Sequence, residues 1–206
     1  MGSNSDRMAA DAARLFLQHD QEEMIRRWNL DADEKSIYIP FFADENTLGI
    51  DRKSGEVYII CEDSNNPGTT DRNLTWEAMT VYDLLTFSRE RPEAAGEWVS
   101  IAQLGGVIGI WHQEELSSPL AERFASRTDA FTVACERAGG MPEKNLKGDV
   151  TFSFRVFMDF GICLQFWDED DEFPAQIRYF FDRNALRFMH YETLWYVLNI
   201  LEKRII

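Results

Sequence analysis

The stretch that decides the fold is DVTFSFRVF, residues 149–157, in which apolar and polar side chains alternate. Successive side chains of an extended chain point to opposite faces, so strict alternation gives one apolar and one polar face. This period is typical of an antiparallel strand with one buried face. The apolar face holds Val150, Phe152, Phe154 and Val156, and the polar face holds Thr151, Ser153 and Arg155.

Two further strands follow in GICLQFW, residues 161–167, and AQIRYFF, residues 175–181. Pro174 stands just before the second of them, where a missing N–H is tolerated. The chain then ends in HYETLWYVLNILEKRII, residues 190–206, whose apolar residues recur at helical spacing. We therefore expect a three-stranded antiparallel sheet covered by an amphipathic helix.

The first part of the chain shows a similar order of elements. Residues 7–28 have helical periodicity with a break near His19 and Asp20, because acidic residues cluster there. Three β-rich segments follow, with a short glycine-containing hairpin loop at 51–55, and the next segment is polar and turn-rich. The expected strands lie near 36–42, 47–51 and 56–61, and the connection spans 62–73.

The middle of the chain predicts two helices separated by a short strand. The first helix starts near Asn73 or Thr75, either of which is a suitable cap. Residues 98–101 are strand-like, and Gly105 and Gly106 mark a turn. One continuous helix then begins at Pro119, after Ser117 or Ser118, and ends at the pair Gly139–Gly140.

These elements predict the α+β class, with antiparallel sheets covered by amphipathic helices. Both halves follow the order helix, three strands, helix, so an internal duplication and a chance similarity of order both stay open. We expect a single domain over 1–206, with a subdivision near 62–74 or 89–97 as the alternative, and disorder in 1–7.

Composition narrows the range of partners. The chain has 36 acidic and 21 basic residues, for a net charge of −15. This excess disfavours nucleic acids and anionic membranes, which recruit proteins through lysine and arginine. A basic protein or a cation is the easier partner. The sequence leaves the identity of any cofactor open.

The cysteines and the apolar segments indicate a cytoplasmic protein. Cys61, Cys135 and Cys163 are widely spaced and form no CxxC pair, which argues against a disulfide scaffold and against an iron–sulfur site. No apolar run reaches membrane-spanning length, and the first residues lack the apolar core of a signal peptide.

Several motifs resemble one known family over about residue 73 to the end. They are GEWVS (96–100), PLAERF (119–124), the pair Gly139–Gly140, GDVTFSF (148–154), WDEDDEFPA (167–175) and FDRNALRFMHYETLW (181–195). In this combination the chain resembles the domain of unknown function 3786, a family found mostly in anaerobic bacteria and archaea.

The resemblance implies a fold but no established activity. Some relatives carry an added cysteine-rich segment that hints at anaerobic redox or corrinoid metabolism, and this chain lacks such a segment. Met158 and Phe160 stand where the family pattern has prolines, so the resemblance leaves the shape of the first hairpin open.

Sequence fingerprints of common catalytic classes are missing. The chain has no G-x-S-x-G nucleophile elbow, no GxxxxGK[ST] phosphate loop, no HExxH zinc motif and no GxGxxG. Catalytic residues therefore stay unknown, and whether the protein is an enzyme stays open.

The acidic segment 168–174, DEDDEFP, is the best candidate site, together with the adjacent Trp167. Asp168, Asp170 and Glu172 would share one face of an extended backbone, where their oxygens could bind Ca²⁺ or Mg²⁺. The segment does not fit the glycine and glutamate positions of an EF-hand loop, so no metal is assigned. The other two interpretations are a hydrated hairpin turn that prevents edge pairing and a protein-binding patch.

Within this segment we expect a division of roles. Phe173, with Pro174, should anchor the loop in the core. Glu172 should then turn inward, to cap a helix or to pair with Arg155 or Arg178, because a buried carboxylate needs a partner.

Four residues outside the segment have structural and functional interpretations. Asp149 and Asp182 suit turns, and Glu192 suits the positive end of the last helix. His190, with Asp182 and Glu192, could instead form a general-base group, although a solvated loop histidine is the simpler interpretation. We read Cys163 as a core residue.

Together these patterns predict a cytoplasmic, non-catalytic binding or accessory domain that engages a partner protein or small ligand through the acidic segment and Trp167. The candidate ligand residues are Trp167, Asp168, Asp170, Glu172 and His190. A metal-dependent enzyme that uses the acids at 168–172, with Asp149 or His190, is the alternative.

Overall fold

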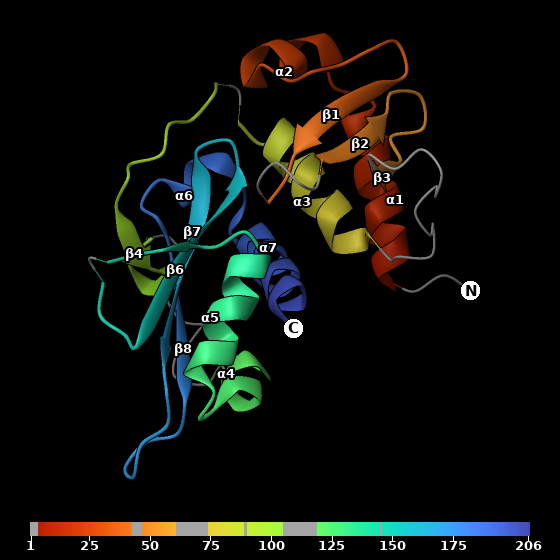
Figure 1. The fold of residues 1–206 in the computed structure, drawn as a ribbon. Helices are drawn as coiled ribbons and strands as arrows, with labels where there is room; N and C mark the ends of the chain where they lie inside the picture. The colour runs from red at the N-terminus through yellow and green to blue at the C-terminus, as the bar shows by residue number, and fades with distance from the viewer. Residues whose placement is uncertain (1–3, 43–46, 61–73, 89, 105–118, 145) are drawn as a thin grey trace. The chain divides into compact units, whose positions relative to one another are not determined.

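Two antiparallel sheets define the architecture (Figure 1), with strand orders β1-β2-β3 and β4-β8-β7-β6-β5. The computed structural model describes residues 4–42, 47–60, 74–88, 90–104, 119–144 and 146–206. Helices and antiparallel sheets together confirm the α+β class. The predicted turn at Gly105–Gly106, the connection 62–73 and residues Cys61 and His112 lie outside the described ranges.

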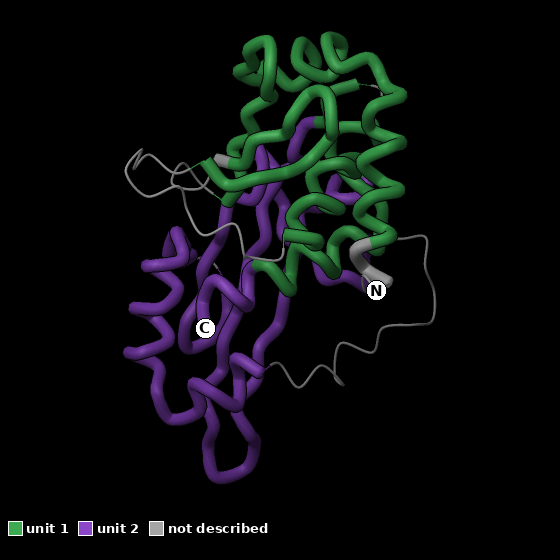
Figure 2. The backbone as a smooth tube through the Cα atoms, turned by 90° about the vertical axis from the view of Figure 1, so that its right-hand side faces the viewer, with its two compact units in different colours: residues 1–92, 187–200 green, residues 93–186, 201–206 purple. Residues whose placement is uncertain are grey.

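The chain divides into two compact units (Figure 2). Unit 1 comprises residues 1–92 and 187–200, and unit 2 comprises residues 93–186 and 201–206. The division falls within 89–97, where the sequence offered a subdivision as the alternative to a single domain.

Unit 1 begins with two helices, α1 (Asn4–Phe16) and α2 (Gln21–Trp28). Asp20 caps α2, since its side chain accepts a hydrogen bond from the backbone N–H of Glu23 at 3.0 Å. The predicted break near His19 and Asp20 is therefore confirmed. Helix α1 starts at Asn4, inside the segment that we expected to be disordered.

The sheet of unit 1 consists of β1 (Ser36–Pro40), β2 (Thr47–Asp51) and β3 (Val57–Ile59), close to the predicted strands. Gly49 lies between Tyr38 and Tyr58 in the register. A Cβ atom at Gly49 would come within 2.3 Å of the Tyr58 ring, so only glycine allows that ring to cross the strand.

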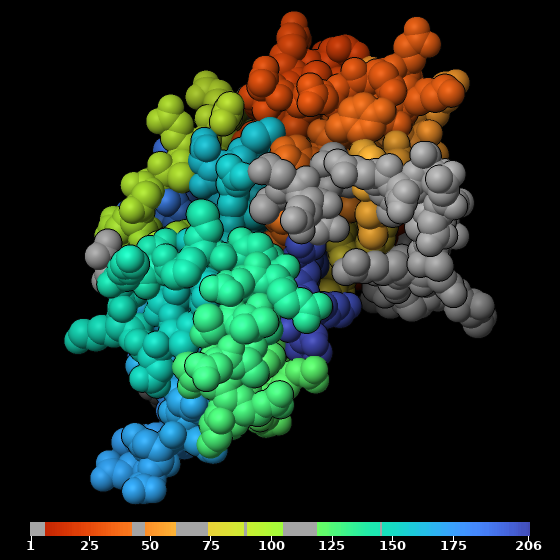
Figure 3. All heavy atoms as spheres, in the orientation of Figure 1, coloured from red at the N-terminus to blue at the C-terminus, as the bar shows by residue number. Residues whose placement is uncertain are grey.

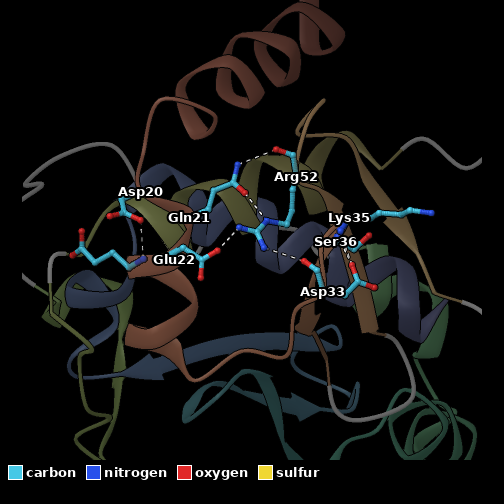
Figure 4. A network of polar contacts seen from close by, with 8 residues as sticks. Asp20, Gln21, Glu22, Asp33, Lys35, Ser36 and Arg52 are labelled. Carbon is cyan, nitrogen blue, oxygen red and sulfur yellow. Dashed lines mark hydrogen bonds and ion pairs between the residues drawn. The ribbon is translucent and has the colours of Figure 1, made fainter.

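A polar network ties α2 to this sheet (Figure 4). The Arg52 side chain donates to Gln21 Oε1 at 3.1 Å and to the carbonyl oxygen of Asp33 at 2.9 Å, and it also pairs with Glu22. Asp33 in turn accepts hydrogen bonds from the Ser36 N–H and the Tyr38 hydroxyl. The hydrogen bonds lower the pKa of Asp33, the one from Tyr38 most of all.

Helix α3 (Thr75–Thr86) packs on α1 through Phe16 and Tyr82, whose ring centroids are 5.6 Å apart. Thr75 is its first helical residue; the N-cap is Leu74, which makes no side-chain cap. The buried hydroxyl of Tyr82 donates to the Gly55 carbonyl at 2.5 Å, which fixes the β2–β3 turn against α3.

The sheet of unit 2 is built on the predicted meander of β6 (Val150–Phe157), β7 (Phe160–Trp167) and β8 (Gln176–Asp182). Two short strands flank it, β4 (Trp98–Ser100) beside β8 and β5 (Met141–Pro142) beside β6. The sequence did not indicate β5.

Both faces of this meander are largely buried, which differs from the one-faced burial that alternation predicts. Thr151 and Ser153, on the polar face of β6, are each only 7% exposed. Their hydroxyls donate to backbone carbonyl oxygens of Lys147 and Met141, which allows burial of both polar groups.

The helix predicted from Pro119 to Gly139 is two helices, α4 (Pro119–Phe124) and α5 (Thr128–Arg137). The helical conformation is interrupted at Ser126, which has a left-handed φ of 57°. Gly139, also left-handed with a φ of 85°, follows the end of α5 as predicted. Helix α5 covers the sheet through Phe131, which stacks on Phe166 with centroids 4.6 Å apart.

The chain ends with α6 (Ala185–Phe188), which the sequence did not indicate, and α7 (Tyr191–Ile205), which it did. Residues of α7 up to Ile200 belong to unit 1 and the remainder to unit 2. Within the described ranges, no helix has the length and apolar character needed to span a bilayer.

Candidate functional site

Asp168 forms the base of the β7–β8 loop, which we call the acidic loop (residues 168–174). Its Oδ1 accepts a hydrogen bond from the backbone N–H of Ser126 at 2.7 Å, and its Oδ2 accepts one from the Thr128 hydroxyl at 2.6 Å. Glu169 adds a bond from the Ser126 hydroxyl at 2.5 Å. Two acids of the predicted site thus hold the turn between α4 and α5.

These contacts favour the charged form of Asp168. Partial burial opposes ionisation, but the hydrogen bonds from Thr128, Ser126 and Glu169 outweigh it and lower the pKa of Asp168. The carboxylate also lies at the start of α5, where negative charge is favourable. Asp168 is therefore a structural anion whose oxygens are already engaged.

Asp149 supports the same region from the start of β6. Its Oδ2 accepts a hydrogen bond from the backbone N–H of Asp168 at 2.8 Å, and its own N–H donates to the carbonyl of Phe166 at 2.9 Å. The sequence suggested a turn residue at Asp149; its side chain does accept a backbone hydrogen bond, but the donor lies across the hairpin.

Asp170 organises the tip of the loop. Its Oδ1 accepts hydrogen bonds from the backbone N–H groups of Glu172, at 2.8 Å, and Phe173, at 2.7 Å. The Asp170 N–H donates to the Phe173 carbonyl at 3.0 Å. The side chain and backbone of one aspartate thus close the turn.

Phe173 does not anchor the loop in the core, and that prediction is wrong. Its side chain is 59% exposed, and Pro174 is also exposed. The hydrogen bonds of Asp170 fix the backbone of the tip, so the turn needs no buried aromatic residue. In Figure 3 the loop, in blue, extends beyond the rest of its unit.

The prediction for Glu172 is also wrong. The residue is exposed, and within the described ranges its carboxylate forms no ion pair and caps no helix. Arg178 instead lies over Trp167, with its guanidinium carbon 5.0 Å from the ring centroid. This cation–π contact keeps Trp167 half-buried beside the loop.

The acids of the loop do not converge on one point. Asp168 binds the α4–α5 turn, Asp170 binds its own turn, and Glu172 lies in solvent. Across the described ranges, no group of three or more His, Cys, Asp or Glu residues has the geometry to hold a metal ion. The geometry therefore lends no support to a metal centre at 168–172.

Asp182, at the end of β8, is 3% exposed and binds three backbone N–H groups. Its Oδ1 accepts from Asn184 and Ala95 and its Oδ2 from Gly96, all at 2.8 Å. The bond to Asn184 is the predicted Asx turn. The other two secure the segment that leads into β4.

His190 pairs with neither Asp182 nor Glu192. Its ring Nδ1 lies 2.6 Å from Oδ1 of Asp83, a residue of α3 that the sequence did not single out. Glu192 is exposed in the first turn of α7, as predicted from the helix dipole. The general-base group proposed from sequence is therefore replaced by a pair between His190 and Asp83.

The described cysteines are buried thiols. Burial raises the pKa of Cys135 and of Cys163 to about 12, with smaller effects from Glu136 and Glu143 respectively. Both are free and fully buried. Cys163 is a core residue, as the sequence indicated.

Comparison with protein families identifies the family of this chain. The family described as Domain of unknown function (DUF3786) matches residues 20–204. The chain belongs to the DUF3786 family. No curated protein and no solved structure matches this DUF3786 chain.

Sequence reasoning missed the partners that position these DUF3786 side chains. Asp83 lies 107 residues before His190, and Ser126 lies 42 residues before Asp168. Neither has a local motif, because Asp83 looks like an ordinary polar position of a helix and Ser126 lies inside a helical pattern. A paired substitution pattern between relatives is the signal that could have revealed them.

Proposed function

We propose that this DUF3786 chain is a binding or accessory domain that engages a partner protein through the tip of the acidic loop, residues 170–174. The observation that carries the proposal is the exposure of Phe173, at 59%, on a turn closed by Asp170. Aromatic side chains are enriched among the residues that dominate protein–protein binding.

The tip is ordered before binding. Three hydrogen bonds within Asp170–Phe173 close the turn, and Asp168 and Asp149 hold its base. Ordering a loop on association costs free energy, so a preformed turn presents its aromatic ring at a smaller cost. This order favours a docking role over a merely hydrated connection.

The charge of the tip defines the chemistry of the partner. Asp171 and Glu172, the two residues before Phe173, are both exposed. A partner with an apolar pocket rimmed by lysine or arginine would complement both features. The net charge of −15 supports the same class of partner, and it opposes a nucleic acid.

A cytoplasmic location belongs to the same proposal. Its support is the absence of cysteine pairing in the sequence pattern and the two free thiols, Cys135 and Cys163, in the core of unit 2. Free thiols of this kind are usual in a reducing compartment.

The test is affinity capture from the native host with the wild-type chain and three variants. Phe173→Ser removes the aromatic ring, and Glu172→Gln removes one exposed charge. Met141→Ser is the matched control, because Met141 is an equally prominent apolar side chain of unit 2, at 61% exposure.

We expect one set of proteins to bind the wild type and the Met141→Ser variant but not the Phe173→Ser variant. Glu172→Gln should weaken capture, most visibly at low salt, where exposed charges are least screened. The captured protein should then bind the purified wild type and the purified variants with affinities that follow the same order. Equal capture by Phe173→Ser and wild type would contradict the proposal.

A further inference from the structure

A histidine–aspartate pair lies in unit 1, apart in sequence from the acidic loop. Asp83 accepts at Oδ1 from the His190 ring at 2.6 Å, and at Oδ2 from the His190 backbone N–H at 2.8 Å. The Thr193 hydroxyl donates to the same Oδ2 at 2.5 Å. Three donors therefore fix the carboxylate of Asp83, whose side chain is only 14% exposed.

This arrangement determines which ring nitrogen of His190 carries the proton. A carboxylate accepts hydrogen bonds and cannot donate them. In the neutral imidazole, Nδ1 is thus the N–H donor to Asp83, and Nε2 keeps a free lone pair. The side chain of His190 is 61% exposed, so reagents in solution have access to the ring.

The ring of Phe87 completes the surroundings. Its centroid lies 4.3 Å from that of the imidazole in an edge contact, and its side chain reaches the surface at 36% exposure. Asp83, itself held by Thr193, restrains the imidazole through Nδ1, and Phe87 contacts the ring, so its orientation is fixed. An acyl or aryl group could rest on the exposed part of Phe87 beside the imidazole.

We propose that His190 is a nucleophilic imidazole, positioned by Asp83, that accepts acyl groups from activated esters. This activity goes beyond the binding role of the acidic loop and rests on different residues. The buried Cys135 and Cys163 remain protonated thiols, and a thiol is a far weaker nucleophile than a thiolate.

The reaction has two steps. In the first, the Nε2 lone pair forms a bond to the ester carbonyl carbon, the bond from that carbon to the leaving oxygen breaks, and the alcoholate leaves with the electron pair. The acylated ring is cationic, and the carboxylate of Asp83 stabilises its Nδ1–H.

In the second step, water attacks the acyl carbon. The carbon–Nε2 bond breaks, and its electron pair returns to the ring as the lone pair of Nε2. Of the two protons of the water, one ends on the alcoholate that left in the first step and the other on the carboxylate, from which it can dissociate into solvent. The net reaction is hydrolysis of the ester, and His190 is regenerated.

The test uses the full chain with p-nitrophenyl acetate as the probe. His190→Gln removes the nucleophile but keeps the backbone N–H that binds Asp83. His19→Gln is the matched control, since His19 is also exposed and its ring contacts no carboxylate within the described ranges. Asp83→Asn tests the positioning role.

We expect His190→Gln to lower the rate of p-nitrophenolate release about tenfold more than His19→Gln does, a difference equivalent to ~1.4 kcal/mol in activation free energy. Mass spectrometry of the quenched reaction should find the transient acetyl group on His190. Equal effects of the two histidine substitutions, or acetylation confined to other residues, would overturn the proposal.

A spectroscopic measurement separates positioning from folding. Two-bond ¹H–¹⁵N correlation spectra of the wild type, recorded under conditions in which the ring of His190 is neutral, should show His190 with its proton on Nδ1. Asp83→Asn should lose this preference and lower the rate. A wild-type ring protonated on Nε2 would contradict the assignment even if Asp83→Asn fails to fold.

Discussion

At the scale of single residues, Phe173 shows that an apolar side chain can have a role outside the core. Its ring is 59% exposed on a turn that Asp170 closes. Phe166, seven positions earlier, is fully buried and stacks on Phe131. Substitutions at these two phenylalanines therefore compare the effect of removing an exposed ring with that of removing a buried ring.

We predict that Phe173→Ala changes the free energy of unfolding by less than about 0.5 kcal/mol, as is usual for exposed positions. Phe166→Ala should cost about 3–5 kcal/mol, because it removes a buried ring and leaves a cavity. Urea denaturation of both variants measures the difference. A loss of several kcal/mol in Phe173→Ala would restore the anchoring role that the sequence suggested.

Asp168 illustrates how an acid of the loop can serve the fold. Its folded pKa is lowered, so its contribution to stability is present above the unfolded value of about 3.9 and disappears as the pH falls through the folded value. Asp168→Asn keeps the size of the side chain and removes this charge.

We predict that Asp168→Asn is less stable than wild type by about 1–2 kcal/mol near neutral pH, the usual loss for a side chain that binds the start of a helix. The gap should hold from about pH 7 to about pH 5 and narrow as the pH falls further, through the folded value. Thermal unfolding across this range provides the measurement. Asp171→Asn, at an exposed position, is the control and should follow the wild type.

At the scale of elements, hydrophobic periodicity located the strands well. Alternation in β6 and the apolar residues of β7 and β8 directly reflect the pairing of three neighbouring strands. The break between α4 and α5 could not be predicted in this way. Ser126 is held in its left-handed conformation by Asp168, a partner that only the folded chain brings near.

The same reasoning explains which parts of the candidate sites could be predicted. Asx turns at Asp170 and Asp182 depend on residues two or three positions away, so the sequence contains their signal. The pair of Asp83 and His190 depends on the packing of α3 against the start of α7. Its histidine was visible in the sequence, but its carboxylate was not.

Asp182 gives the prediction at this scale. Asp182→Ala leaves the N–H groups of Ala95, Gly96 and Asn184 without their acceptor. We expect a loss of about 2–4 kcal/mol, since a hydrogen bond to a charged group contributes about 1.5–3 kcal/mol and the N–H groups of the exposed Ala95 and Gly96 can bind water instead.

Hydrogen exchange should localise this effect. Amides of β4 and of the segment before it should lose protection in Asp182→Ala, while those of β6 and β7 keep most of theirs. Glu192→Gln, an exposed acid of α7, serves as the control and should leave the exchange of β4 unchanged. Uniform loss of protection across the sheet would show that Asp182 supports the whole unit instead of one edge.

At the scale of the whole molecule, the two units carry different chemistry. Unit 2 presents an ordered acidic tip with an exposed aromatic ring, and unit 1 presents an oriented imidazole. The proposed docking and acyl-acceptor roles can therefore be removed separately, by Phe173→Ser and His190→Gln. Both variants change exposed side chains, so each should preserve the fold while it removes one role.

The buried thiols report on the integrity of unit 2. Burial raises the pKa of Cys135 and Cys163 to about 12, whereas an unfolded cysteine titrates near 8.5. In a Cys61→Ser variant, both thiols should resist a disulfide reagent in native buffer and react at once in denaturant. The stabilising effect of this burial is complete below about pH 8.5 and should decline as the pH rises toward the folded pKa. Rapid modification of both thiols in native buffer would mean that the core of unit 2 opens far more readily than its packing implies.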